Sequence, residues 1–309
     1  MTRKSQLFGA MLLALAPSAS LAVPTSPVAW VSKQFGNDAA GCGAVTNPCR
    51  TFQYALDNVV VAGGTIAVRD AGGYGPLTIS KSIAIINQSA GIGGIFGPPD
   101  AAILIQAGAS DVVLIKGLTL EGSGTGETGI RARSVGKLVI ANCNIKSFRH
   151  SSTSAGVDVQ PISGAVDFSL TDSLITGNSY AGVNVQPNPF AAVSGLISNV
   201  TITKNPNGLF AQSANNGPIK ISIADSVLTH NDFGLFTFGN LAVVAAARIN
   251  ASQNDYGAAA TSQAEIDLSF SALTNNKTVD AFSNGAAVIK SYGNNDIRNS
   301  STLTPASLK

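Results

Sequence analysis

The side chains best suited to acid–base chemistry are one carboxylate and two guanidiniums that follow equivalent glycines. Arg131 and Arg133 stand two and four positions after Gly129. Asp158 stands two positions after Gly156. A carboxylate can donate or accept a proton in a reaction, and a guanidinium can hold a substrate carboxylate through paired hydrogen bonds. We therefore expect Asp158 to be the acid or base of any reaction, with Arg131 or Arg133 neutralising the substrate.

Amides and then aromatic rings occupy the same two positions after later glycines. These residues are Gln160, Asn184, Gln186, Phe210, Gln212, Phe236 and Phe238. Amides both donate and accept hydrogen bonds, and flat rings offer surface for stacking. The pattern predicts a ligand-binding face that is polar at one end and aromatic at the other. The alternative is an ordinary exterior ladder of stacked amides, with the three phenylalanines covered by a loop.

The common catalytic and metal-binding patterns are incomplete. Glycoside hydrolysis generally uses two carboxyl groups, but only Asp158 qualifies on this face, because Asp167 begins the next predicted strand. No repeat clusters the several acids that calcium needs, so calcium is left open without support, and no metal site or cofactor is expected. His150 and His230 fall in predicted turns without a visible partner. The Gly-x-Gly-x-x-Gly pattern at 124–129 leads into a strand rather than a helix, which predicts a turn and not a phosphate site.

These positions depend on an internal repeat that runs through most of the chain. Its glycines are Gly129, Gly156, Gly182, Gly208, Gly234 and Gly257, at successive spacings of 27, 26, 26, 26 and 23 residues. A second motif recurs in step, in which alternating apolar residues lead to a turn residue. The turn residues are Asn142, Asp172, Asn199 and Asp225. Short strands with period-two alternation, separated by residues that favour turns, account for both motifs.

One turn of such a chain cannot bury its apolar side chains, whereas stacked turns can. The sequence therefore predicts an all-β fold, a parallel β-helix (solenoid) of about ten levels that spans residues 65–300. Alternation places one set of side chains in a shared interior column. Its members are Val157, Val183, Leu209 and Leu235.

The three cysteines fall in two settings. Cys42 and Cys49 stand seven residues apart in a loop rich in Gly, Asn and Pro, and are predicted to form a disulfide. Cys143 belongs to an inward column, which predicts a small buried side chain rather than a reactive thiol. The other members of that column are Ser173, Val200 and Ser226.

The first 22 residues have the features of a secretory signal. Arg3 and Lys4 give a positive start, residues 7–16 are apolar, and residues 20–22 offer a small-residue cleavage site. No later segment is apolar over the length needed to span a bilayer. We therefore expect an exported protein, in the periplasm or outside the cell.

The charge balance argues against two classes of partner. Without Arg3 and Lys4, the remaining 17 basic residues equal the 17 acidic residues. A neutral chain without runs of Lys or Arg has no electrostatic attraction for nucleic acid or for an anionic membrane.

Two N-terminal segments, residues 30–38 and 47–56, carry a family resemblance. With the repeat, they make the chain similar to the secreted right-handed parallel β-helix proteins of the pectin-lyase-like superfamily. The resemblance implies a strand, a cysteine loop and a capping helix within 23–64, the β-helix at 65–300 and a tail at 301–309. The superfamily includes lyases, hydrolases, esterases, epimerases and adhesins, so the resemblance is specific for fold and weak for activity.

Three functions from different classes follow. The leading hypothesis is an exported protein without a complete catalytic motif, whose lateral face binds an extended ligand such as a polysaccharide or cell-surface glycan. The first alternative is a polysaccharide lyase, hydrolase or epimerase that acts through Asp158 with Arg131 or Arg133. The second alternative is a structural or adhesive surface protein. In the superfamily's polysaccharide enzymes this lateral face often lines the substrate groove, which is why the first two hypotheses place the ligand there.

Overall fold

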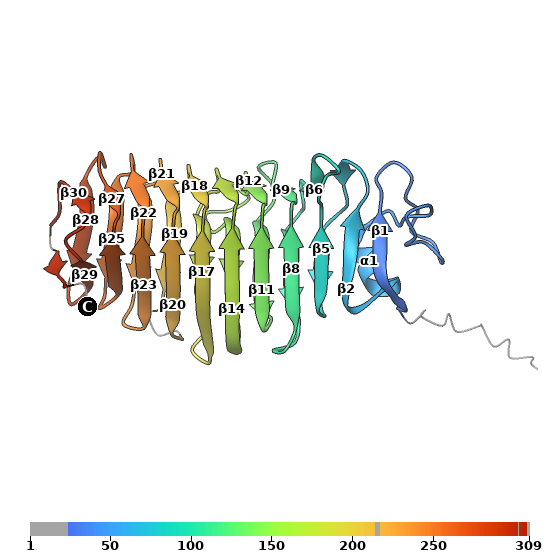
Figure 1. Ribbon diagram of the computed structural model, residues 1–309, viewed down its shortest axis with the longest axis horizontal. Helices are drawn as coiled ribbons and strands as arrows, with labels where there is room; N and C mark the ends of the chain where they lie inside the picture. Colours follow the sequence, from blue (N-terminus) through green and yellow to red (C-terminus); the bar gives the residue numbers. More distant parts are fainter. Residues whose placement is uncertain (1–23, 214–216, 302, 308–309) are drawn as a thin grey trace, which may run out of the picture.

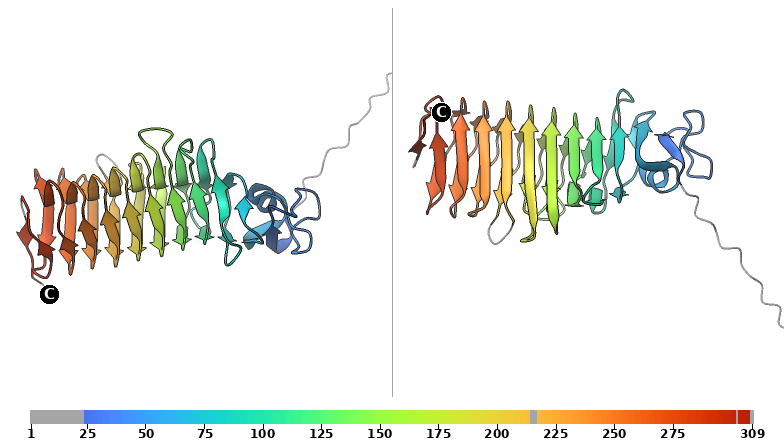
Figure 2. Two further views of the ribbon diagram at one scale, coloured as in Figure 1. Left: turned by 90° about the horizontal axis from the view of Figure 1, so that it is seen from above. Right: turned by 60° about the horizontal axis from the view of Figure 1, so that its bottom comes forward.

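A computed structural model describes residues 24–213, 217–301 and 303–307 of the chain. The expected secretory signal at 1–22 lies outside the described residues. Figure 1 shows a rod of stacked turns, and Figure 2 shows the same stacking from two other directions. The described part of the chain is a parallel β-solenoid with one short helix, which confirms the predicted architecture.

Within the described residues, the strands form three parallel sheets of twelve, nine and ten strands, named here sheets I, II and III. Sheet I contains β1 (Ser26–Val31), β2 (Val60–Val68), β5 (Ile83–Ile86), β8 (Val112–Lys116), β11 (Lys137–Ala141), β14 (Gly164–Thr171), β17 (Ala191–Ser198), β20 (Ile219–Ala224), β23 (Ala242–Ala247), β26 (Glu265–Ser269), β29 (Val288–Ser291) and β31 (Thr304–Pro305). Sheet II contains β4 (Leu77–Ile79), β7 (Ala101–Gln106), β10 (Thr128–Ser134), β13 (Ala155–Val159), β16 (Ala181–Val185), β19 (Asn207–Gln212), β22 (Phe233–Phe238), β25 (Tyr256–Thr261) and β28 (Val279–Asn284). Sheet III contains β3 (Gly72–Gly73), β6 (Gly93–Phe96), β9 (Thr119–Glu121), β12 (Asn144–Lys146), β15 (Leu174–Thr176), β18 (Thr201–Thr203), β21 (Val227–Thr229), β24 (Asn250–Ser252), β27 (Ala272–Leu273) and β30 (Asp296–Ile297).

The core runs along the axis of the rod, because each turn places its apolar side chains above those of the turn before. Val157 pairs with Val183, Val183 with Leu209, and Leu209 with Leu235 in the registers of sheet II. All four side chains are fully buried, so the predicted inward column is confirmed. The outward faces of the sheets follow from the same alternation.

The corners between sheets I and III are built on left-handed backbone. Asn142, Asp172, Asn199 and Asp225 have φ of 52°, 51°, 54° and 51°. Asparagine and aspartate tolerate this conformation better than most residues. The Asn199 amide also donates to the Asp172 carboxylate at 2.7 Å. The predicted turns and stacked side-chain hydrogen bonds are therefore confirmed at this corner.

A second ladder lies inside the rod at the turns before five successive strands of sheet II, β16, β19, β22, β25 and β28. The side-chain oxygen of Asn205 accepts a hydrogen bond from the backbone N–H of Asn178 at 3.0 Å. The side-chain oxygen of Asn231 accepts in the same way from the backbone N–H of Asn205 at 3.1 Å. Asn254 and Asn276 continue the ladder to the next turns. These amides satisfy backbone groups that the turns leave unpaired, which explains the recurring asparagine.

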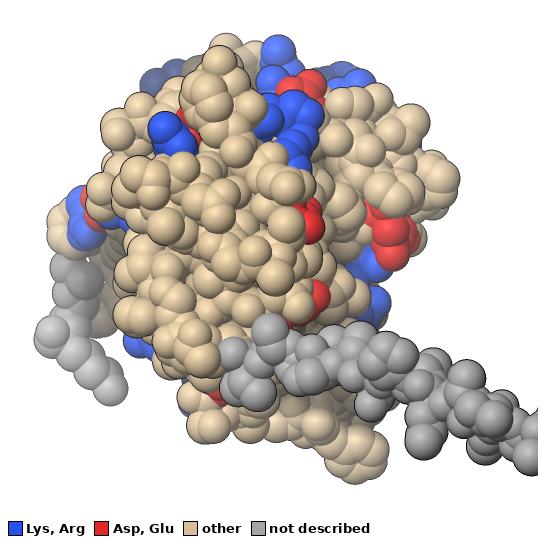
Figure 3. Space-filling model, turned by 90° about the vertical axis from the view of Figure 1, so that its right-hand side faces the viewer, with Lys and Arg blue, Asp and Glu red and all other residues tan. Residues whose placement is uncertain are grey.

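The helix α1 (Phe52–Asn58) covers the first turns at one end of the rod. Thr51 accepts a hydrogen bond from the Tyr54 N–H and begins the helix, while Phe52 and Leu56 are buried against the core. The Gln53 amide accepts from the Thr78 N–H at 2.7 Å and donates to the Thr78 carbonyl at 3.3 Å. This side chain thereby pairs with β4 at the edge of sheet II, as a further strand would. Figure 3 looks onto this end, where acidic and basic side chains are scattered among uncharged ones.

The cysteines have the states that their surroundings predict. Cys42 and Cys49 form a disulfide in the loop beside β1. Cys143 is a buried free thiol, and burial raises its pKa to about 11. Among the described residues, no helix has the length and apolar character that crossing a membrane requires.

Candidate functional site

The outward face of sheet II brings together the residues that the repeat singles out. Arg131 in β10 pairs with Asp158 in β13, which pairs with Asn184 in β16. The same row continues through Phe210 in β19 to Phe236 in β22. These side chains lie on five successive turns because each turn advances by one strand spacing.

Asp158 is the centre of a buried charged cluster in this row. The residue is only 4% exposed to solvent. Arg131 Nε lies 3.1 Å from Asp158 Oδ2, and Asn184 Nδ2 donates to Oδ1 at 2.9 Å. Burial raises the pKa of the Asp158 carboxyl, and the hydrogen bond from Asn184 and the Arg131 charge oppose that rise. Both carboxylate oxygens are thus engaged inside the protein.

The Arg131 guanidinium is surrounded by acids. Besides Asp158, Glu127 lies 3.4 Å and Asp100 3.8 Å from its Nη1 atom. Its Nη2 atom donates to the Thr128 hydroxyl at 2.6 Å. The guanidinium that was expected to neutralise a substrate carboxylate therefore already has three acidic neighbours of its own.

Arg133 begins a second, more accessible row of polar side chains. Its Nη1 atom donates to the Gln160 side-chain oxygen at 2.8 Å, and the Gln160 amide donates to Gln186 at 3.3 Å. Gln212 on the next turn hydrogen-bonds the hydroxyl of Tyr180. Arg133 and the three glutamines are each partly exposed. Within the described residues Arg133 has no ion pair shorter than 4 Å, so this row faces solvent with unused donors and acceptors.

The aromatic residues of sheet II form a continuous stack rather than isolated platforms. The rings of Phe210 and Phe236 are 4.8 Å apart and inclined by only 3°. Phe236 stacks in turn on Phe233 at 4.9 Å, and Phe233 stacks on Tyr256 at 4.7 Å. The stack is bounded by edge contacts with Tyr180 and Phe282. Since neighbouring rings cover each other's faces, the partly exposed Phe236 presents mainly its ring edge to solvent, whereas Phe210 is buried at 7% exposure.

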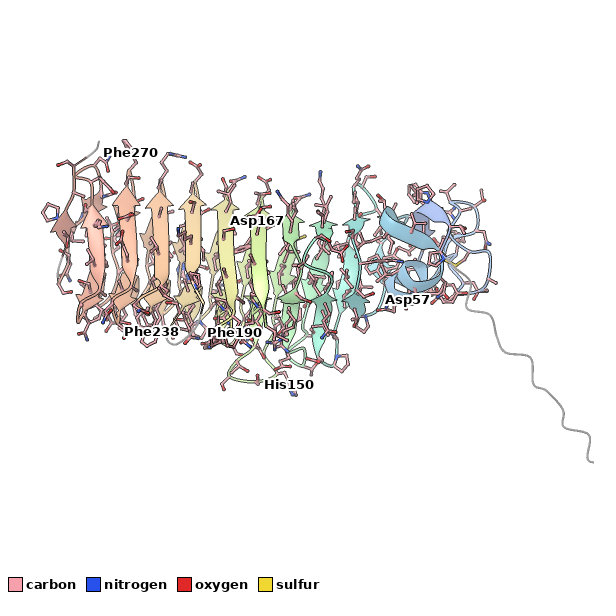
Figure 4. All side chains as sticks on the ribbon, turned by 90° about the horizontal axis from the view of Figure 1, so that it is seen from below. Asp57, His150, Asp167, Phe190, Phe238 and Phe270 are labelled. Atoms are coloured by element: carbon pink, nitrogen blue, oxygen red, sulfur yellow. A yellow bond between two sulfur atoms is a disulfide. The ribbon has the colours of Figure 1, made fainter. Side chains whose placement is uncertain are left out.

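Four members of this stack were missed from the sequence, where only Phe210, Phe236 and Phe238 were considered. They are Tyr180, Phe233, Tyr256 and Phe282. Phe233 and Tyr256 each stand immediately before a repeat glycine, so the position before the glycine was the available signal. Phe238, the last residue of β22, is partly exposed and lies at the lower border of the rod in Figure 4.

Among the hollows on the described surface of the rod, two bear on the candidate site. One, of about 380 Å³, lies at the α1 end of sheet II, between the strands β4 and β7 and the loops before them. Its lining residues include Gln53, Pro76, Thr78, Pro99, Asp100 and Leu104. The other, of about 350 Å³, lies on sheet I around Asp167, Ser194 and Lys220. Figure 4 shows Asp167 on that face, away from the edge where His150, Phe190 and Phe238 lie.

The histidines do not join either surface. His230 lies in a turn with φ of 56°, and its Nδ1 atom is 3.1 Å from the Thr229 hydroxyl. His150 lies in the loop before β13. In the part of the chain that the structure describes, no three His, Cys, Asp or Glu side chains are grouped as metal ligands.

Comparison with known proteins defines the fold. No protein-family model matches the sequence, and no curated protein matches it either. Among solved structures, the A-module of the mannuronan C-5 epimerase AlgE4 of Azotobacter vinelandii is similar, with a TM-score of 0.55 and 14% identity over 78% of this chain and 81% of that one. The similarity, together with the three parallel sheets, shows that the chain shares the parallel β-helix fold of this module. This similarity concerns the fold alone.

Proposed function

We propose that this protein is exported and binds an extended polysaccharide along the outward face of sheet II. The observation that carries the proposal is the partly exposed row of Arg133, Gln160 and Gln186, joined by hydrogen bonds of 2.8 and 3.3 Å. Each glutamine amide in the row hydrogen-bonds a neighbouring side chain of the row and still offers further donors and acceptors to the hydroxyl groups of a ligand. Successive turns repeat these groups every ~4.8 Å, which suits a ligand that is itself a repeating polymer.

Binding is favoured over catalysis by the surroundings of Asp158. A general acid or base must come within ~3 Å of the proton that it transfers. Asp158 is 4% exposed, and its oxygens are held by Arg131 and Asn184. A substrate would have to displace one of these partners to reach the carboxyl group.

Two further observations support the proposal. The structurally similar protein is an epimerase of mannuronan, a polysaccharide, although one fold hosts many functions. The Cys42–Cys49 disulfide agrees with export, because disulfides persist in oxidising compartments.

The test is glycan binding by a chain that starts at residue 23, first on an array of extracellular glycans and then by calorimetry with the best ligand. We expect the Gln160→Ala/Gln186→Ala double variant to bind at least tenfold more weakly. The Lys220→Met variant, which alters the hollow on sheet I, is the matched control and should bind as the unmodified protein does. Loss of binding in Lys220→Met alone would move the site to sheet I, and no binding to any glycan would favour a structural or adhesive role.

Catalysis is the second candidate, favoured by the raised pKa of Asp158 and by the likeness to an epimerase. The reaction would be lysis, hydrolysis or epimerisation of a polysaccharide, with Asp158 as acid or base. New unsaturated ends, new reducing ends or inverted sugar configuration would be measured with uronide polymers, with and without calcium. Turnover that Asp158→Asn abolishes would establish this alternative.

A further inference from the structure

The hollow at the α1 end of sheet II continues the row that contains Arg131 and Asp158. Thr78 in β4 pairs with Leu104 in β7, and Leu104 pairs with Arg131 in β10. Thr78 and Leu104 are lining residues of the hollow, whose volume is about 380 Å³. The hollow is therefore contiguous with the proposed binding face and lies one turn from its polar rows.

The walls of this hollow are held in place before any ligand arrives. Pro76 and Pro99 stand on the loops that lead into β4 and β7, and their rings fix the local backbone. Gln53 is bound to both backbone groups of Thr78 and also donates to the Asp57 carboxylate at 2.9 Å. A preformed hollow loses less conformational entropy when a ligand binds.

The lining combines an apolar floor, made by Leu104 and the two proline rings, with one exposed carboxylate. Leu104 is half-buried, and both prolines belong to the same lining. The Asp100 side chain is 68% exposed and reaches Arg131 only at 3.8 Å. A sugar ring has an apolar face that suits the floor and hydroxyl groups that can donate to a carboxylate. Such charge-assisted hydrogen bonds are stronger than neutral ones.

The local charge disfavours an acidic sugar. Asp100, Glu127 and Asp158 all lie within 4 Å of Arg131, so three acids surround one guanidinium. Arg133 on the neighbouring row supplies one more cation, and acids still exceed bases by one. A uronate placed in the hollow would bring its carboxylate toward Asp100, whereas a neutral sugar would bring only hydroxyls.

From this geometry we infer that the ligand of sheet II is a neutral polysaccharide, and that one of its sugar residues occupies the hollow beside Asp100. The inference rests on the proposed function, because it names the ligand class of the same face. It separates this protein from its structural relative, whose substrate mannuronan is a uronic acid polymer.

The experiment compares mannuronan oligosaccharides with the neutral oligosaccharides obtained by reducing their carboxyl groups, so that linkage and length are matched. Affinities are measured by calorimetry at low and moderate salt. We expect the reduced oligosaccharides to bind at least tenfold more tightly. We expect Asp100→Asn to weaken that binding about tenfold and Asp100→Lys to shift the preference toward mannuronan. Asp296→Asn, a change at an exposed acid of the far end of the rod, is the control and should have no effect.

The outcomes distinguish the two proposals. Tighter binding of mannuronan than of its reduced form would overturn the neutral-ligand inference and leave the proposed function standing. A neutral preference that Asp100→Asn leaves unchanged would overturn the placement of a sugar in the hollow. Binding of acidic glycans alone on the array would also overturn the neutral-ligand inference. If neither oligosaccharide binds, nor any glycan on the array, the proposed function fails as well. Thermal unfolding of each variant shows whether a loss of affinity reflects loss of the fold.

Discussion

The buried pair of Arg131 and Asp158 allows one prediction to be worked out in detail. Replacing Arg131 by Met keeps much of the side-chain volume but removes the only cation in direct contact with Asp158 among the described residues. Asp158 is 4% exposed, so its charge would be left with little water and with only the more distant Arg133 as a counter-charge. Removing one partner of a buried pair costs roughly 3–5 kcal/mol of unfolding free energy. Because Asn184 still donates to the carboxylate at 2.9 Å, we expect the low end, about 3 kcal/mol at pH 7.

The pH dependence of this cost has a definite sign. Burial already raises the pKa of Asp158 above its ordinary value of 3.8, so the folded state holds this proton more strongly than the unfolded state. The stability contributed by the protonated carboxyl is full below pH 3.8 and is lost as the pH rises through the folded pKa. Arg131→Met removes a charge that opposes the rise, so the pKa of Asp158 increases further. Near pH 3.5 the carboxyl is mostly neutral in both states, and the cost should fall to about 1 kcal/mol for lost hydrogen bonds.

The assay is urea-induced unfolding, followed by circular dichroism at pH 7 and at pH 3.5. The Asp158→Asn substitution completes a double-mutant cycle, since an uncharged amide needs no cation. We expect Asp158→Asn to recover most of the stability lost in Arg131→Met at pH 7. A cost below about 1 kcal/mol at pH 7, or the same cost at both pH values, would refute the reasoning that Asp158 is a buried charge held by Arg131.

Three other predictions concern the core and the ladders. In Gly195→Ala the new Cβ would lie 2.2 Å from the Phe168 ring, so we expect the free energy of unfolding in urea to fall by roughly 1–3 kcal/mol. Adding Phe168→Leu should recover part of this stability. An additive loss of stability in the double variant would contradict the contact. Asn231→Ala removes the acceptor for the Asn205 N–H at 3.1 Å, and the unpaired buried group should cost roughly 1–3 kcal/mol, with Asn188→Ala in an exposed loop as the control. The pKa of about 11 and the burial of Cys143 predict no alkylation by iodoacetamide in the native protein at pH 8 and rapid alkylation in urea. Mass spectrometry distinguishes these results, and native labelling would show that the column around Cys143 opens.

Most of the fold could be predicted because its rules are local and repeat at every turn. A glycine every 26 or so residues and strict alternation after it place Val157 and Val183 in one column whatever the rest of the chain does. Asn142 and Asp172 likewise mark a corner, because their side chains favour left-handed backbone. The Cys42–Cys49 disulfide follows from two nearby cysteines in one loop.

The sequence predicted where the candidate site lies on the rod but not which of its side chains are buried. Alternation places Asp158, Arg131 and Asn184 on the outer face of sheet II, and the register confirms that they are neighbours. It does not say that Asp158 is buried there, because burial depends on the side chains of adjacent turns and on the loops beside them. The predicted set of stacked rings was incomplete because Phe233 stands before the repeat glycine, whereas the motif assigns only the positions after that glycine.

The amino-acid order by itself determined the period, the inward and outward faces and the corners of this protein, since these are properties of a few consecutive residues that stacking copies from turn to turn. Only the tertiary structure decided which outward groups meet solvent. The acids around Arg131 come from three different turns, and the hollow beside Asp100 needs Gln53 from the capping helix. Contacts between residues so far apart in the chain leave no periodic trace, because each occurs once and depends on the shape of its surroundings.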